Sequence, residues 1–330
     1  MTERLSMPIR VAAACVLALL AQVAMASGPP DARAWIARMN EALARRNYDG
    51  VFVQQAGGRR DTLRIIHRMR DGRMTERLIF TDGSGREYIR NGSDATWYVP
   101  EKRAVIVEER GRSSGYITAL YGVSTETEKY YQLRSAEQPV RVRGFTARLI
   151  TVEPRDALRY GYRFWIDEKT GMPVRTQLVS PAGEVLVEIS FISMSLPDVV
   201  SDELLKPDVD TTDYRHFQRT TPAPPNSIRT VFVPRENLLP PGFRMKTFGP
   251  QPAGSAPRSR FIISDGIAWV SVFIEKIGPD QPGVEHRSEG QWQMGTTAGY
   301  TASAAGHRIT VVGDVPPATV KAIAGAVQPE

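Results

Sequence analysis

The chain has almost no cysteine, since Cys15 is the only one among its 330 residues. Cys15 lies inside an apolar N-terminal stretch, Val11–Val23, that we expect to be removed on export. A mature chain without thiols cannot form disulfides, bind a metal through thiolates or use a cysteine nucleophile. Its stability must therefore come from the burial of side chains.

Long hydrophobic runs are also missing. Val11–Val23 is shorter than the ~20 residues that a membrane-spanning helix needs. Arg4 and Arg10 precede this stretch and Ala24-Met25-Ala26 follows it, which is the pattern of a secretory signal peptide. We predict that residues 1–26 are cleaved off and that the mature chain is exported as a soluble protein. An uncleaved membrane anchor is the alternative.

Residues for metal or cofactor chemistry are scarce. The chain has four histidines, far apart and in no metal-ligand spacing: His67, His216, His286 and His307. A phosphate-binding glycine loop and a dinucleotide fingerprint are both missing. We therefore predict that the protein binds no metal and no cofactor.

One pattern suggests hydrolysis. Gly111–Gly115 fits G-x-S-x-G, with Ser113 in the place of the nucleophile. Such a nucleophile elbow belongs on a parallel sheet with alternating helices, whereas the surrounding sequence is typical of antiparallel hairpins. We interpret the segment as a loop and predict that the protein is not an enzyme.

The chain does contain many short strands. The clearest are in Ala157–Phe191, where apolar residues alternate along three strands joined by two turns. Similar strands, separated by glycine-containing turns, follow one another from Tyr48 to Glu108. An amphipathic helix, with Asp31 as N-cap and Trp35, Met39 and Leu43 on its apolar side, precedes them. These features predict an α+β protein that is mostly antiparallel β.

The length of the chain is sufficient for two domains. Thr220–Asn226 is rich in proline and short polar residues, which indicates a linker. We assign residues 27–217 to a large N-terminal domain, 218–227 to the linker and 228–330 to a small C-terminal α+β domain.

Arginines are the first candidate for a binding site. The net charge is +6, and arginines are concentrated between Arg59 and Arg90. This favours anionic partners such as lipid headgroups, lipopolysaccharide phosphates or an acidic protein segment, but nucleic acid is not expected for an exported protein. The candidate residues are Arg64, Arg68, Arg77 and Arg90. The alternative is a solvated outer face of the sheet.

The apolar face of the sheet is the second candidate, because a half-open sheet with a covering helix can enclose a lipid-sized cavity. Its candidate lining residues are Trp35, Met39, Trp97, Tyr162, Phe164, Leu178, Val187 and Ile189. The alternative is that these side chains form an ordinary hydrophobic core.

Several motifs occur in a fixed order along the chain. They are Glu87–Gly92, Gly161–Asp167 with Thr170–Pro173, Leu239–Phe243, Ser264–Ala268 with Ser271–Glu275, and Val311–Pro317. Together they resemble the RseB/MucB family of periplasmic sigma-E regulators. The likeness extends over nearly the whole mature chain.

This resemblance implies an N-terminal domain similar to the LolA and LolB lipoprotein carriers, which is an unclosed antiparallel barrel with covering helices. It implies a periplasmic protein that binds the periplasmic part of a transmembrane anti-sigma factor, RseA- or MucA-like, and shields it from the site-1 protease. Lipid-like or lipopolysaccharide signals are expected to release this partner. In the C-terminal domain we expect Phe243, Trp269 and Phe273 to contact it.

A lipid or lipoprotein carrier without a regulatory role would have a similar sheet. A carrier needs the N-terminal domain but not the C-terminal one, so the second domain favours the regulator. The sequence is compatible with a homo-oligomer as well as with a monomer.

Overall fold

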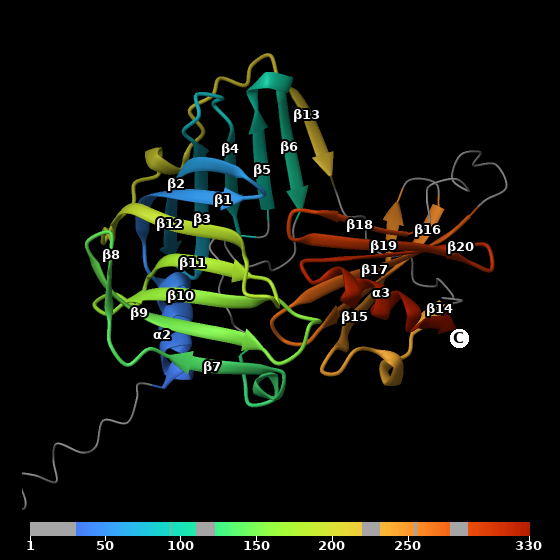
Figure 1. Ribbon diagram of the computed structural model, residues 1–330. Helices are drawn as coiled ribbons and strands as arrows, with labels where there is room; N and C mark the ends of the chain where they lie inside the picture. The colour runs from blue at the N-terminus through green and yellow to red at the C-terminus, as the bar shows by residue number, and fades with distance from the viewer. Residues whose placement is uncertain (1–30, 93, 110–122, 220–231, 254–255, 278–289) are drawn as a thin grey trace, which may run out of the picture.

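The computed structural model describes residues 31–92, 94–109, 123–219, 232–253, 256–277 and 290–330 (Figure 1). The predicted signal peptide, Ser113 and most of the predicted linker lie outside these residues. Two lobes stand side by side in Figure 1, and we call residues 31–219 the large lobe and 232–330 the small lobe.

The large lobe is built on one 13-stranded sheet, whose order is β13-β6-β5-β4-β3-β2-β1-β12-β11-β10-β9-β7, with β8 paired to β9. Its strands are β1 (Tyr48–Ala56), β2 (Arg59–Arg70), β3 (Arg73–Phe80), β4 (Glu87–Asn91), β5 (Asp94–Val99), β6 (Ala104–Glu109), β7 (Tyr131–Ser135), β8 (Val140–Val142), β9 (Phe145–Pro154), β10 (Gly161–Asp167), β11 (Pro173–Val179), β12 (Val185–Ser195) and β13 (Arg215–Arg219). Three short 3-10 turns, η2 (Pro100–Lys102), η3 (Thr127–Lys129) and η4 (Glu203–Leu205), lie in its connections.

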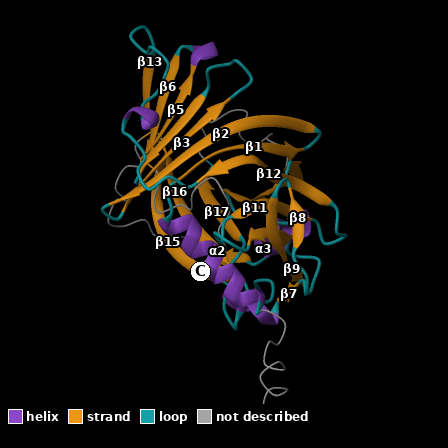
Figure 2. Cartoon of the chain, turned by 90° about the vertical axis from the view of Figure 1, so that its left-hand side faces the viewer, coloured by secondary structure: helices purple, strands orange, loops and turns teal. Residues whose placement is uncertain are grey.

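This sheet curves without closing into a barrel (Figures 1 and 2). Strands β13 and β7 are its two ends and do not pair with each other. Neighbouring strands are antiparallel, except that β13 runs parallel to β6. The predicted class, a mostly antiparallel α+β fold with an unclosed barrel, is therefore confirmed.

Helix α2 (Ala32–Arg45) lies along the part of the sheet formed by β7 and β9–β11 (Figure 1). The predicted N-cap is confirmed, because the Asp31 Oδ1 accepts a hydrogen bond of 2.9 Å from the backbone N–H of Arg33. Ile36 and Met39 are buried, whereas Trp35 is only partly buried, with the guanidinium of Arg38 5.0 Å from its ring centroid. No helix in the described residues is long and apolar enough to cross a membrane.

The inner face of the sheet is filled by its own side chains. Side chains from α2 and from strands far apart in the sheet order, such as Phe52, Ile150 and Phe164, belong to one buried cluster. Phe164 is 0% exposed and Phe52 packs against Phe191 with 5.5 Å between ring centroids. The segment after β12 covers part of the opposite face, where Ile66 packs with residues around η4.

The small lobe is a six-stranded antiparallel sheet with one helix. Its sheet has the order β15-β16-β17-β20-β19-β18, formed by β15 (Arg244–Ala253), β16 (Ala256–Ser264), β17 (Trp269–Lys276), β18 (Gly290–Met294), β19 (Thr297–Ala304) and β20 (His307–Gly313). Strands β14 (Phe232–Pro234) and β21 (Val327–Pro329) form a separate pair, and η5 (Glu236–Leu238) is a 3-10 turn. Helix α3 (Pro317–Gly325) packs against β19 and β20, and its Val320 and Ile323 belong to the same buried cluster as the sheet residues Val270 and Val272.

A buried histidine makes the large lobe sensitive to acid. His67, on β2, is 1% exposed and stacks on Tyr48 with ring centroids 4.5 Å apart. Its Nδ1 lies 3.0 Å from the carbonyl oxygen of Arg46. Burial lowers the pKa of His67 from 6.5 to about 4; the charge of Arg90 also lowers it, and the hydrogen bond to Arg46 opposes both.

We expect this histidine to cost the protein about 3 kcal/mol of stability at pH 4. The unfolded chain takes up the proton below pH 6.5 and the folded chain only near pH 4, so stability is complete above pH 6.5 and falls between these values. Urea unfolding at about pH 7.5 and at pH 4 measures the loss. The variant His67→Asn should lack this part of the pH dependence, whereas His216→Asn, at an exposed site, should keep it. An unchanged pH dependence in His67→Asn would contradict the assignment.

Candidate functional site at the lobe junction

A turn of the small lobe enters the large lobe. Ser264–Ala268 joins β16 to β17, and its Ile267 belongs to the buried cluster of the large lobe. Asp265, at the start of this turn, has a side chain that is 0% exposed. The junction is therefore built by insertion of one lobe into the other.

The Asp265 carboxylate is fully used in hydrogen bonds. Its Oδ1 accepts from the backbone N–H groups of Ile267 at 2.9 Å and Ala268 at 2.8 Å, which fixes the turn. Its Oδ2 accepts from the Tyr131 hydroxyl at 2.9 Å and from the Arg159 Nε at 2.7 Å, both in the large lobe. A buried carboxylate is stable only when it is paired and hydrogen-bonded in this way.

Arg159 is the matching cation, and its side chain is 0% exposed. Besides Asp265 it pairs with Asp156 and donates to the carbonyl oxygen of Pro241 in the small lobe. Its guanidinium lies 4.8 Å from the ring centroid of Tyr130 and 4.9 Å from that of Phe243, within the range of cation–π attraction. Arg159 thus contacts the small lobe through the Asp265 carboxylate, the Pro241 carbonyl group and the Phe243 ring.

Tyr131, on β7, serves as a donor to this pair. Burial, together with the negative charge of Asp265, raises the pKa of Tyr131 well above 10. The hydroxyl therefore stays protonated at neutral pH and keeps donating to Asp265. We call Tyr131, Arg159 and Asp265 the junction cluster.

Two more contacts fasten the junction. The Thr319 hydroxyl, on α3, donates to the carbonyl oxygen of Leu158 at 2.7 Å. Gly242 has a φ of +83°, and a Cβ there would lie 2.5 Å from a ring carbon of Tyr130. Only glycine allows the small lobe to approach Tyr130 this closely.

A groove of about 530 Å³ lies beside the junction cluster, and we call it the interlobe groove. Its lining comes from both lobes: Ser124, Glu126, Thr127 and Tyr130 from the large lobe, and Gly242, Arg244, Lys246, Asp265, Gly266 and Trp269 from the small lobe. Cations, hydroxyl groups and aromatic rings together suit the binding of a ligand with acidic and apolar groups.

The charges of this groove are mainly positive on the side of the small lobe. Arg244 and Lys246 form no ion pair with any described residue. Glu126 is paired with Lys129 at 2.8 Å, and this hydrogen bond, helped by the charge of Arg244, lowers the pKa of the Glu126 carboxyl. The groove therefore presents two free cations beside Trp269, which is 57% exposed.

The three predicted partner contacts occupy different positions. Trp269 lines the groove. Phe243 is 3% exposed and does not line the groove, and its ring faces the guanidinium of Arg159. Phe273 is half-buried on the face of the small sheet opposite α3, 5.7 Å from the guanidinium of Arg260. Of the three, Trp269 alone is both exposed and in the groove.

The four predicted anion-binding arginines do not form one site. Arg64 pairs with Asp49 at 2.7 Å, and the buried Arg77 pairs with Glu87 at 2.8 Å and with Asp208 at 2.7 Å. Arg68 pairs with Asp202 at 2.5 Å. These three are on one face of the sheet, whereas the register places Arg90, whose Nε donates to the carbonyl oxygen of Gly92 at 3.1 Å, on the other.

The predicted lipid-cavity residues are divided between core and periphery. Met39, Phe164 and Ile189 are buried in the large-lobe cluster, and Trp35, Trp97 and Tyr162 are partly buried against it. Leu178 and Val187 are half-buried and face each other across β11 and β12. A vacant, lipid-sized cavity is therefore not needed to explain where these side chains lie.

Sequence reasoning did not identify the junction cluster as a site. From the sequence, Ser264–Ala268 is named only as one of the motifs that carry the resemblance. That motif, and Leu239–Phe243, supply Asp265, Pro241 and Phe243 to the junction. No group of histidine, aspartate and glutamate residues that could hold a metal occurs in the described part of the chain.

Comparisons with known proteins agree over both lobes. A family model described as the MucB/RseB N-terminal domain matches residues 31–209, and one described as the MucB/RseB C-terminal domain matches residues 235–328. Similar proteins include the sigma factor AlgU regulatory protein MucB of Pseudomonas aeruginosa, 27% identical over 91% of this chain and 92% of the relative. The sigma-E factor regulatory protein RseB of Escherichia coli K12 is 24% identical over 91% of this chain and 92% of the relative.

Solved structures show the same fold. The crystal structure of MucB in complex with MucA(peri) has a TM-score of 0.66 and 24% identity, and covers 91% of this chain and 99% of that chain. The crystal structure of MucB has a TM-score of 0.60 and 24% identity, over 92% of this chain and 100% of that chain.

Proposed function

Because this chain belongs to the MucB/RseB family, we propose that it is a periplasmic regulator that binds the periplasmic part of a transmembrane anti-sigma factor. In this role it shields the partner from site-1 proteolysis, and lipid-like signals of envelope stress release it. The related MucB forms a complex with MucA(peri), which supports a partner of this kind. The relatives carry the names of regulatory proteins rather than of enzymes.

The interlobe groove is the observation on which we base the place of binding. It combines an exposed tryptophan, Trp269, with the two cations Arg244 and Lys246. Aromatic residues are typical anchors of protein interfaces, and free cations attract an acidic segment and orient it. A partner segment with an apolar side chain next to acidic ones fits this lining.

Release by a lipid requires a difference in affinity. A lipid can displace the partner only if it binds the partner-free form better, and a tenfold preference supplies about 1.4 kcal/mol. The inner face of the large lobe is filled by its own side chains, so lipid binding there requires these side chains to move apart. The half-buried pair Leu178 and Val187 is the part of the predicted cavity with the least packing to lose.

Trp269→Ala should weaken binding of the anti-sigma periplasmic fragment at least tenfold, because truncation of a central aromatic anchor costs about 2 kcal/mol or more. The dissociation constant is measured by calorimetric titration of the mature chain. Trp292→Ala is the matched control, since Trp292 is also an exposed tryptophan of the small lobe but lies outside the groove. Equal effects of the two variants would place the partner elsewhere.

The same titration with an added amphiphile separates this function from that of a carrier. Tight binding that the amphiphile weakens supports both partner binding and release. Binding that the amphiphile leaves unchanged supports the regulator without lipid release. No association at high micromolar concentration, with lipid co-purifying, would replace the proposal by a lipid or lipoprotein carrier.

A further inference from the structure

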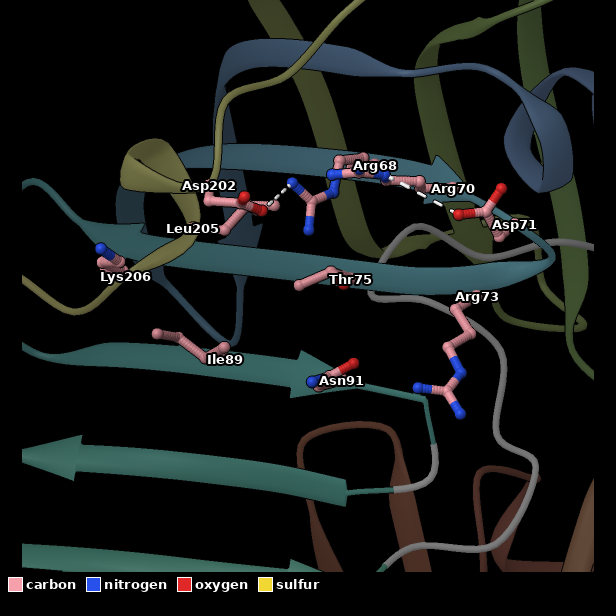
Figure 3. Close-up of a pocket in the computed structure, with 10 residues that line it drawn as sticks. All are labelled: Arg68, Arg70, Asp71, Arg73, Thr75, Ile89, Asn91, Asp202, Leu205 and Lys206. Atoms are coloured by element: carbon pink, nitrogen blue, oxygen red, sulfur yellow. Dashed lines mark hydrogen bonds and ion pairs between the residues drawn. The ribbon is translucent and has the colours of Figure 1, made fainter.

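A second pocket, of about 550 Å³, lies in the large lobe at the end of the β2–β3 hairpin (Figure 3). It opens on the outer face of the sheet, where η4 packs over β2 and β3. Four cations line it, Arg68, Arg70, Arg73 and Lys206, and we call it the basic pocket. It shares no residue with the interlobe groove.

Acids compensate only part of this charge. Asp202 pairs with Arg68 at 2.5 Å, and Asp71 lies 3.8 Å from Arg70. The Asp202 side chain is 65% exposed and that of Asp71 is 92% exposed, so solvent screens both pairs. Lys206 pairs with Glu203, again on the surface. The lining itself has four cations and two acids, and Glu203 adds a third acid next to it, so the net charge is positive.

Several donors in this pocket are still available. One terminal nitrogen of Arg68 is held by Asp202 and by the carbonyl oxygen of Val200, whereas the other points into the pocket toward Thr75 (Figure 3). The Arg68 Nε is buried, and no described residue hydrogen-bonds to it. Arg73 forms no ion pair with any described residue, and its guanidinium extends beside Asn91 (Figure 3).

From this geometry we infer that the basic pocket binds a phosphate group. Phosphate carries up to two negative charges and several acceptor oxygens, which match guanidinium forks that converge from separate strands better than a single carboxylate does. Ile89 and Leu205 add an apolar side to the pocket, next to which the remainder of a phosphoester can lie. The phosphate is either that of a lipid headgroup or that of a soluble phosphoester. The site does not depend on the proposed partner binding.

The test compares two double variants of the full mature chain. Arg70→Gln/Arg73→Gln removes two exposed cations of the pocket, and Arg59→Gln/Arg60→Gln removes two exposed cations from the other end of β2. Each double variant loses two positive charges, and all four arginines lie on β2 or on the β2–β3 hairpin. Neither removes Arg68, whose contacts to Val200 and Asp202 hold η4 in place. The probes are inorganic phosphate, and phosphatidylcholine vesicles with and without phosphatidic acid, at constant ionic strength.

We expect the pocket variant to bind the phosphate probe at least tenfold more weakly than the wild type, and the control variant to change binding less than twofold. Saturable binding of inorganic phosphate assigns the site to soluble phosphate, and binding only to vesicles with phosphatidic acid assigns it to a lipid headgroup. Equal losses in the two variants would mean that general charge attraction is responsible and would overturn the site. Failure of every probe to bind the wild type saturably would also overturn it.

Discussion

Asp265→Ala is expected to lower the free energy of unfolding by about 3–5 kcal/mol, because it removes the buried counter-charge of Arg159 and leaves only Asp156, whose side chain is 32% exposed, as its acid partner. Arg159 and Asp265 have side chains that are 0% exposed, so water cannot replace the lost carboxylate without opening the junction. The variant also removes the acceptor of the Tyr131 hydroxyl and the cap of the Ser264–Ala268 turn. Calorimetry or urea unfolding measures the loss.

Two further variants show whether the cause is the buried charge. Glu203→Ala breaks a surface ion pair with Lys206, whose partners are 78% and 61% exposed, and should change stability by less than about 1 kcal/mol. Arg159→Met/Asp265→Leu removes both charges and should be more stable than Asp265→Ala alone. A loss below about 1 kcal/mol in Asp265→Ala would mean that the junction cluster does not hold the lobes together.

Phe164→Ala is expected to cost about 3–5 kcal/mol, the usual range for removal of a fully buried phenyl group. Phe164 is 0% exposed, stacks on Tyr162 with centroids 5.9 Å apart and belongs to the large-lobe cluster. Urea unfolding of the large lobe, followed by circular dichroism, measures the change. The result tests whether the inner face is a packed core or a vacant binding space.

Leu178→Ala is the control on the same sheet. Leu178 is half-buried and outside the cluster, so its truncation should cost less than about 1.5 kcal/mol. If Phe164→Ala costs no more than Leu178→Ala, Phe164 lines a vacant space and the predicted lipid cavity is present. If Phe164→Ala costs several times more than Leu178→Ala, the inner face is a packed core, and a lipid can bind there only if core side chains move apart.

Most strands of the large lobe could be predicted, because their local patterns agree with their final surroundings. The strands predicted between Tyr48 and Glu108 correspond to β1–β6, since their apolar residues alternate and glycine-containing turns separate most of them. Strands β18 and β19 were not predicted, because few of their residues are buried and apolar alternation is weak there.

The site could not be predicted because it depends on distant contacts. Arg159 and Asp265 are 106 residues apart, and neither is unusual in its local sequence. The arginines between Arg59 and Arg90 look like one group in sequence, but alternation along the strands sends Arg68 and Arg90 to opposite faces. Acids from a later segment, such as Asp202, then neutralise some of them. Proximity in the sequence therefore does not show which of these arginines remain without an acid partner.

The two ends of the open sheet have different attachments to the small lobe. At one end, β13 leads into the chain segment that continues to β14; at the other end, Tyr131 on β7 belongs to the junction cluster. The contacts at the junction are therefore intramolecular, with an effective concentration on the order of millimolar. If the junction opens, the small lobe remains tethered and re-docks without a bimolecular step. A partner whose binding in the groove requires the junction to open competes with the re-docking of the tethered small lobe. The apparent affinity of such a partner is therefore lowered by the free energy of closing the junction.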